Sequence, residues 1–219
     1  MVDIPARRRL DAGRLVMVPV SAVMLMLDGR VLIGDVASAG AGLAGALDWL
    51  DTLGIFSFYV LVAVSYLRRG PAVATGESVF AHAIAVLATM ATFAFPLFQR
   101  TPPGTARQIA SDLLIIGGTT WAVWSLRYLG RNLSVIAQAR GIADRGPYRL
   151  VRHPLYTGEI VSSLGLAIVA GTAGAYLVWL ALVGMQIYRA RQEERFLLVT
   201  LPGYRDYRAR TAALLPGLF

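Results

Sequence analysis

The stretch Ile160-VSSLGLAIVAGTAGAYLVWLALVGMQI-Tyr188 contains no charged side chain. A single helix over these 29 residues would be about 44 Å long at 1.5 Å per residue, too long to cross a bilayer without strong tilt. Gly171-Thr-Ala-Gly174 lies in the middle of the stretch and offers a turn. The stretch therefore forms either one tilted helix or a helical hairpin.

The positions of the arginines distinguish these two topologies. Every one of the 21 basic residues is Arg. A hairpin puts 18 of them on the side that holds both chain ends, with Arg100 and Arg107 opposite and Arg30 unassigned. A single crossing would instead put the six arginines after residue 188 outside, against the tendency of basic loops to stay cytoplasmic. We therefore expect a hairpin, both termini in the cytosol, and residues 37–49 and 99–108 outside.

The composition predicts an integral membrane protein with one structural domain. Of the 219 residues, 56% are hydrophobic and only 16% are charged, and the mean hydropathy is +0.58. A net charge of +8 at the ends of apolar segments suits a membrane surface better than nucleic acid, so we expect no nucleic-acid partner. The absence of cysteine excludes disulfides and thiolate metal sites, and two histidines are too few to predict a metal site.

Further apolar segments predict an all-α fold with about five transmembrane elements, of which the last is the hairpin. Residues 79–98 and 109–128 reach the length of a spanning helix, and residues 50–67 nearly do. The run Leu15–Leu27 is interrupted by Asp28-Gly-Arg30 and spans only if its helix continues through Val31–Ile33. The alternative is a signal peptide, with Arg7–Arg9 as its basic region and Val36-Ala-Ser-Ala39 as its cleavage site. In outline, residues 1–128 hold the first helices and residues 129–219 hold a motif loop, the hairpin and a C-terminal segment.

Polar chemistry gathers at the two feet of the hairpin. The segment Arg145-GPYRLVRHPLYTGE-Ile160 precedes the first helix, and Arg189-ARQEE-Arg195 follows the second. A hairpin brings both segments to the same membrane face. The basic and aromatic residues 202–210 suit an interfacial helix or a lid over that face.

Each polar residue also has a structural explanation. Glu193 and Glu194 suit a solvated helix end in which Arg189 and Glu193 form an i,i+4 pair. His153 suits an interfacial residue, with Pro154 in the first turn of the next helix. Asp112 is either an intramembrane functional group or a helix cap. No dinucleotide-binding, Walker or hydrolase motif is found in the chain.

Residues from about 130 to 219 resemble the isoprenylcysteine carboxyl methyltransferase family. The residues that carry the resemblance are Gly146-PYRLVRHPLYT-Gly158, Glu193-Glu194, Pro202-GYRD-Tyr207 and Leu215-PGL-Phe219. Membrane phospholipid N-methyltransferases share part of this pattern. Residues 1–125 match only as a set of membrane helices.

The resemblance implies S-adenosylmethionine as methyl donor, in a cytosol-facing pocket that the C-terminal segment closes. It assigns the cofactor to a set of motif residues, namely Tyr148, His153, Pro154, Tyr156, Gly158, Glu193 and Glu194. A carboxylate acceptor could be held bidentately by an arginine, for which Arg152, Arg191 and Arg195 are candidates that the sequence does not rank. An amine acceptor would instead need a proton acceptor such as Glu193 or His153. A sulfonium is a cation, and carboxylates and aromatic rings are the side chains that hold cations.

The resemblance favours a lipid-linked acceptor of the prenylcysteine carboxylate type, reached from the bilayer of the inner (plasma) membrane. Phospholipid amines and small thiols are alternative acceptors, and a sterol-reductase-like enzyme that uses NADPH or a non-enzymatic scaffold are alternative functions. We expect the acceptor to enter beside Gly117 and Gly118, between the helix at 109–128 and the hairpin, although close helix packing is the commoner use of such glycines. The oligomeric state stays open.

Overall fold

The computed structural model describes residues 12–38, 43–70, 74–75, 79–98, 103–134, 138–139 and 141–216. Several sequence predictions concern residues outside this described part, namely Arg7–Arg9, Ala39, Arg100 and Gly217–Phe219.

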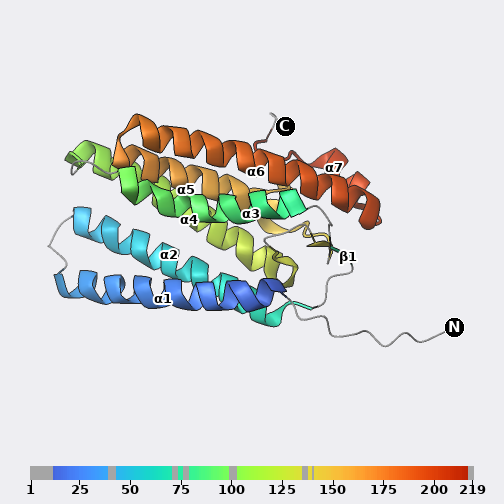
Figure 1. The fold of residues 1–219 in the computed structure, drawn as a ribbon, viewed down its shortest axis with the longest axis horizontal. Coiled ribbons are helices and arrows are strands. Elements are labelled where there is room, and N and C mark those ends of the chain that lie inside the picture. The colour runs from blue at the N-terminus through green and yellow to red at the C-terminus, as the bar shows by residue number, and fades with distance from the viewer. Residues whose placement is uncertain are drawn as a thin grey trace.

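Six long helices lie side by side and connect up and down along the chain (Figure 1). They are α1 (Ala12–Ser38), α2 (Leu43–Arg68), α3 (Val79–Ala91), α4 (Thr105–Leu129), α5 (Pro154–Ala170) and α6 (Ala173–Thr200). The shorter elements are the 3₁₀ segments η1 (Thr92–Phe98), η2 (Gly130–Asn132) and η3 (Gly146–Arg149), the strands β1 (Ala74–Thr75) and β2 (Gln138–Ala139), and the helix α7 (Tyr204–Arg210).

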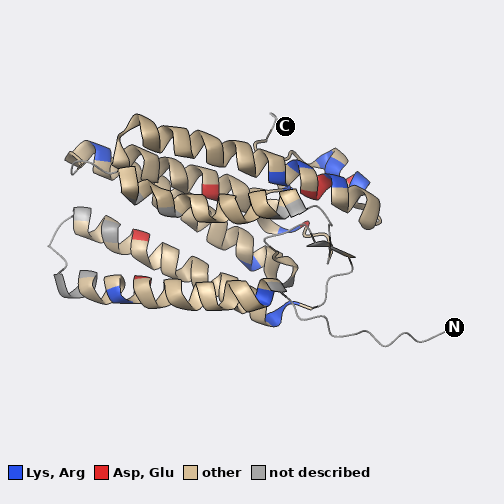
Figure 2. Ribbon diagram, in the orientation of Figure 1, with Lys and Arg blue, Asp and Glu red and all other residues tan. Residues whose placement is uncertain are grey.

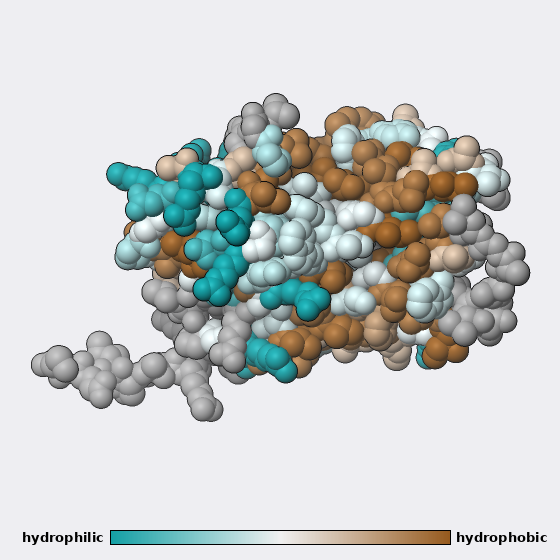
Figure 3. All heavy atoms as spheres, turned by 180° about the vertical axis from the view of Figure 1, so that it is seen from behind, coloured by the Kyte–Doolittle hydropathy of each residue, from teal (hydrophilic) through white to brown (hydrophobic). Residues whose placement is uncertain are grey.

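Charged residues gather at one end of this helical body. Figure 2 shows most of the described arginines at the end where α1 begins and α6 runs into α7. In the space-filling view, hydrophilic side chains collect at that end and apolar ones cover much of the sides (Figure 3). We call it the arginine-rich end. This distribution fits a body whose sides face hydrocarbon and whose one end faces water.

Among the residues that the structure describes, three helices are long and apolar enough to cross a membrane, by length and composition. They are Gly13–Gly34, Gly45–Arg68 and Thr105–Leu129, and α5 is a shorter apolar helix. Helix α1 continues through Asp28-Gly29-Arg30, so the run at Leu15–Leu27 is part of a spanning-length helix in the folded chain. The segment predicted at 79–98 is not one α-helix, because it changes to the 3₁₀ segment η1 after Ala91.

The predicted hairpin is confirmed. Helix α5 ends at Ala170, and Gly171 takes the left-handed conformation (φ 63°) that glycine adopts without steric cost. Thr172 then caps α6 by accepting a hydrogen bond from the Ala175 backbone N–H. Further along the pair, the Trp179 indole donates to the Ile160 carbonyl over 3.0 Å. The hairpin returns the chain to the arginine-rich end.

Helices α4 and α5 pack backbone to backbone through small residues. A Cβ atom on Gly118 would lie 2.4 Å from the Ser162 nitrogen and 2.6 Å from the Gly158 carbonyl oxygen. Ser111 donates to the Gly165 carbonyl over 2.8 Å in the same interface. The predicted entry route at Gly118 is therefore wrong, because the two backbones meet where it would open. Gly117 has no such neighbour within 4 Å.

One further expectation needs correction. Asp112 is not a helix cap: it is buried in the second turn of α4 and accepts a hydrogen bond from Gln108 over 2.7 Å. The predicted all-α fold class is confirmed, and the strand pairing among the described residues is the short antiparallel contact of Ala74–Thr75 with Gln138–Ala139 at the arginine-rich end. Such short pairings depend on tertiary contact and leave no period-2 pattern to find in the sequence.

Candidate functional site

The motif loop before α5 is fixed by local geometry. Gly146 has a positive φ of 58°, and the Tyr128 ring lies where its side chain would be, so only glycine fits there. Pro154 occupies the first turn of α5, as predicted, and His153 stands just before it with a non-helical backbone. The His153 ring therefore lies at the foot of the hairpin.

The C-terminal segment returns across this loop. Residues Val151 and Ala212 form a parallel bridge, and the backbone N–H groups of Arg152 and His153 donate to the carbonyls of Ala212 and Ala213. The Tyr207 hydroxyl donates to the Tyr148 carbonyl over 2.8 Å. The C-terminal segment, residues 204–214, therefore lies against the motif loop, and whether it acts as a lid stays a prediction.

Glu194 joins three elements at the centre of the site. Its Oε1 accepts from Arg152 Nε over 2.6 Å and lies 3.2 Å from His153 Nε2, and its Oε2 lies 3.2 Å from Arg208 Nε. Arg152 also donates to the carbonyls of Arg208 and Thr211. Glu194 and Arg152 therefore hold the motif loop, the end of α6 and α7 together.

Glu193 is placed differently from its neighbour. Its Oε2 accepts from the Tyr156 hydroxyl over 2.9 Å and lies 3.7 Å from His153 Nδ1. The His153 and Tyr156 rings are stacked, with centroids 5.3 Å apart. The Glu193 side chain is 32% exposed, against 10% for Glu194. Glu193 is therefore the carboxylate of the pair that keeps room for a ligand.

A buried polar chain extends from Tyr156 into the hairpin. The Arg189 guanidinium lies over the Tyr156 ring, 4.7 Å from its centroid, and donates to Gln186 over 3.0 Å. Gln186 in turn donates to Glu159. Arg189, Gln186 and Glu159 are not among the site residues predicted from the sequence. Their spacing is a usable signal, because Tyr156 and Glu159 lie three positions apart on α5, as do Gln186 and Arg189 on α6. Residues at this spacing share one face of a helix. Arg189 is not simply an i,i+4 partner of Glu193, because its side chain faces Tyr156.

The remaining predicted residues fall in different places. Tyr148 and Pro154 are buried beneath the loop. Gly158 faces α4, where a Cβ atom would lie 2.7 Å from the Gly118 carbonyl oxygen. Arg195 is exposed. The structure thus gathers Arg152, His153, Tyr156, Glu193 and Glu194, and leaves Gly158 and Arg195 outside the cluster.

The environment of Glu194 changes its pKa. Burial by itself raises the pKa of this carboxyl, but the hydrogen bonds from His153 and Arg152 and their positive charge outweigh burial and lower it to about 2. Burial also raises the pKa of the Tyr207 phenol. Tyr207 is therefore a neutral hydroxyl donor at the pH of the cell, and Glu194 is a carboxylate.

The lowered pKa predicts a pH-dependent attachment of the C-terminal segment. A carboxyl with a depressed pKa stabilises the fold above its ordinary value of 4.5, and this contribution is lost as the pH falls from there through about 2. Hydrogen–deuterium exchange of residues 204–214, corrected for intrinsic rates, should rise between pH 5 and pH 3. In the Glu194→Gln variant, the same segment should exchange faster than in the wild type at both pH values, and its exchange should change little between them. An equal rise in this variant would assign the pH dependence to another group.

Part of this chain is similar to a known protein family. Residues 106–200 match the sequence model of the phospholipid methyltransferase family. The matched segment runs from α4 through the motif loop and the hairpin to the end of α6, and contains all five clustered residues. Residues 201–219, which hold the C-terminal segment, lie outside it.

Two curated proteins are similar over part of the chain. The cobalt-zinc-cadmium resistance protein CzcN of Cupriavidus metallidurans is 34% identical over 103 residues, which are 46% of this chain and 44% of that protein. The nickel-cobalt-cadmium resistance protein NccN of Alcaligenes xylosoxydans xylosoxydans is 32% identical over 117 residues, 50% of this chain and 53% of that protein. The aligned part thus spans about half the length of these relatives. Among the residues described here, no group of three His, Asp or Glu side chains could hold a metal ion.

Proposed function

We propose that this chain is an integral membrane methyltransferase that transfers a methyl group from S-adenosylmethionine to a lipid-linked acceptor. The observation that carries the proposal is the cluster of His153, Tyr156 and Glu193 at the foot of the hairpin, inside a segment similar to phospholipid methyltransferases. We assign the arginine-rich end to the cytosol by the distribution of basic residues. This places the cofactor on the cytosolic side.

The donor set fits a cationic cofactor. When bound, S-adenosylmethionine supplies a methyl group on a sulfonium, which passes to the acceptor as the sulfur–carbon bond breaks and S-adenosylhomocysteine remains. Glu193 offers a partly exposed carboxylate to a cation, and the buried Tyr156 donates its hydroxyl to that carboxylate and holds it in place. Glu194 keeps the C-terminal segment closed, which excludes water from the transfer. Arg152 acts with Glu194 as a positioning residue.

On the acceptor side, we assign Arg189 in place of Arg152 and Arg195. Arg189 is buried beside Tyr156 at the membrane end of the cluster, whereas Arg152 binds Glu194 and Arg195 is exposed. A guanidinium there can hold a carboxylate, which is already ionised at neutral pH and needs no base. This supports a carboxylate acceptor of the prenylcysteine type. The second candidate is a phospholipid amine, favoured by the description of the matched family; Glu193 or His153 would then accept the proton.

Binding measurements separate this proposal from its rivals. In calorimetry, the purified protein should bind S-adenosylhomocysteine and should not bind NADPH. Tritiated S-adenosylmethionine offered with a membrane lipid extract, an S-farnesylcysteine derivative or a small alkyl thiol should then label the acceptor class. Binding of NADPH alone would favour the reductase alternative, and binding of neither would favour a scaffold.

A further inference from the structure

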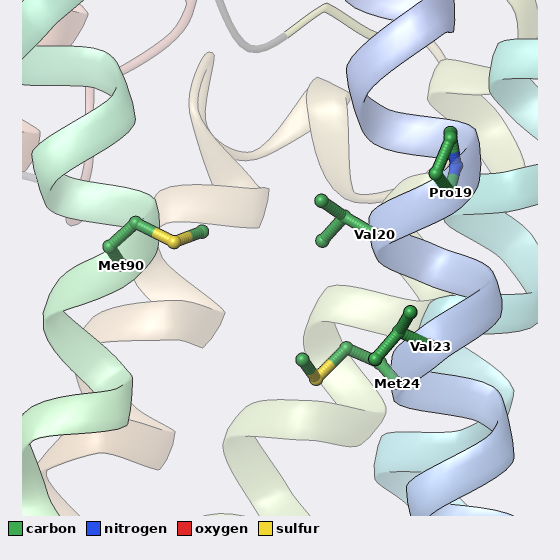
Figure 4. A pocket seen from close by; sticks show the side chains of 5 residues that line it. All are labelled: Pro19, Val20, Val23, Met24 and Met90. Atoms are coloured by element: carbon green, nitrogen blue, oxygen red, sulfur yellow. The ribbon is translucent and has the colours of Figure 1, made fainter.

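An apolar groove opens between the first and third helices. It is lined by Pro19, Val20, Val23 and Met24 of α1 and by Met90 of α3, and has a volume of about 510 Å³. Figure 4 shows Met90 pointing across the gap toward Val20 and Met24. Ligand sites in proteins commonly have volumes of this order. Two of the lining residues are methionines, whose flexible side chains adapt to irregular apolar ligands.

The depth of the groove determines the chemistry of what can fill it. Pro19 and Met24 lie about 10 and 18 Å along α1 from its start, and Met90 lies about 17 Å along α3, at 1.5 Å per residue. Both helices start at the arginine-rich end (Figure 1). The lining of α1 lies within the candidate span Gly13–Gly34. At that depth, a groove open to the bilayer is exposed to hydrocarbon chains.

One apolar face of α3 connects the groove with the candidate site. Phe80, Leu87 and Met90 are exposed and recur at helical spacing along α3. At the arginine-rich end of this face, the Phe80 ring packs edge-on against Tyr188 of α6, with centroids 5.8 Å apart. Tyr188 directly precedes Arg189, which lies over Tyr156. A chain lying along α3 would thus have its polar end beside the site.

Two sides of the hairpin are closely packed in the part of the chain that the structure describes. Helices α4 and α5 meet backbone to backbone at Gly118, and a Cβ atom on Gly165 would lie 2.7 Å from the Ser111 carbonyl oxygen. Helices α5 and α6 are joined by the bonds from Trp179 to Ile160 and from Gln186 to Glu159. The exposed apolar face of α3 is not covered by these contacts, so we take it as the path of an acceptor chain.

We propose that the groove between α1 and α3 holds the hydrocarbon chain of the methyl acceptor while its head group lies beside Arg189. This proposal rests on the methyltransferase function proposed above and names the subsite that selects long-chain acceptors. All five residues that line this groove lie outside the segment that matches the family model.

Photolabelling tests occupancy by a lipid chain. The full chain is placed in vesicles of phosphatidylethanolamine and phosphatidylglycerol that contain a trace of phosphatidylethanolamine with a diazirine in one acyl chain. After irradiation, peptide mapping compares Val23, which lines the groove, with Val31 on the same helix. These valines are 46% and 51% exposed but lie about 12 Å apart along α1. The diazirine is therefore placed in turn near the middle and near the head-group end of the acyl chain, and the strongest labelling of each valine is compared. Labelling of Val23 several-fold above Val31 supports the proposal, and equal labelling overturns it.

Matched variants test the link to catalysis. Val23→Trp and, from the opposite wall, Met90→Trp should each raise the KM for a long-chain acceptor about tenfold, the equivalent of about two buried methylenes. S-Adenosylhomocysteine affinity should not change, which also shows that the variants fold. Val31→Trp should change neither value. An unchanged KM in both groove variants overturns the proposal. If the wild-type protein binds no S-adenosylhomocysteine, the proposed function is contradicted, and the photolabelling experiment alone then tests whether the groove binds a lipid chain.

Discussion

Glu193→Gln should weaken the binding of S-adenosylhomocysteine about 10- to 100-fold, because a charge-assisted hydrogen bond contributes roughly 1.5–3 kcal/mol. The Glu193 carboxylate already orients the Tyr156 hydroxyl, so the variant also loses part of the ring's positioning. Calorimetry of the purified protein measures the change directly. Tyr156→Phe should lose less, since it keeps the aromatic ring.

A matched control removes one negative charge elsewhere at the same end of the molecule. Asp206 is an exposed carboxylate on α7, and Asp206→Asn should leave the affinity unchanged. If Asp206→Asn and Glu193→Gln weaken binding equally, general electrostatics explains the loss and Glu193 has no specific role. Unchanged binding in Glu193→Gln would leave the carboxylate as part of an ordinary helix end.

Gly118→Ala should destabilise the protein strongly, and Gly117→Ala should not. A Cβ atom at position 118 meets backbone atoms of α5 at 2.4 to 2.9 Å, which no rotamer change relieves, so α4 and α5 must separate. We expect a loss of at least about 3 kcal/mol, with weaker cofactor binding as a consequence, because α5 carries Tyr156. Thermal unfolding followed by circular dichroism in detergent measures it.

Gly117 makes this comparison decisive because it is the next residue of the same helix. Nothing lies within 4 Å of a Cβ atom there, so alanine should be neutral or slightly stabilising through its better helix propensity. Equal melting temperatures for Gly118→Ala and the wild type would mean that the two helices are not in backbone contact. The entry route between α4 and α5 would then have to be reconsidered.

Much of this architecture could be predicted from residue types and their order. The uncharged run at 160–188 and the arginines on either side of it predict the hairpin, because charge at a bilayer surface constrains which loops share a side. Pro154 and Gly171 mark the beginning and the turn of that hairpin through their restricted or permissive backbones. The motif residues His153, Tyr156, Glu193 and Glu194 could be identified because their types and order resemble a known family.

The division of roles within the site could not be predicted from the sequence. Glu193 and Glu194 are adjacent and chemically identical, yet two arginines and a histidine surround Glu194, whereas a tyrosine hydroxyl donates to Glu193. Arg152 and Arg189 likewise differ only in which buried group each side chain meets. Gly118 and Gly117 differ only in the direction each faces, toward α5 or away from it. In each pair the difference arises from contacts between residues 14 or more positions apart, because helix rotation and the return of the C-terminal segment depend on how the whole helical body packs.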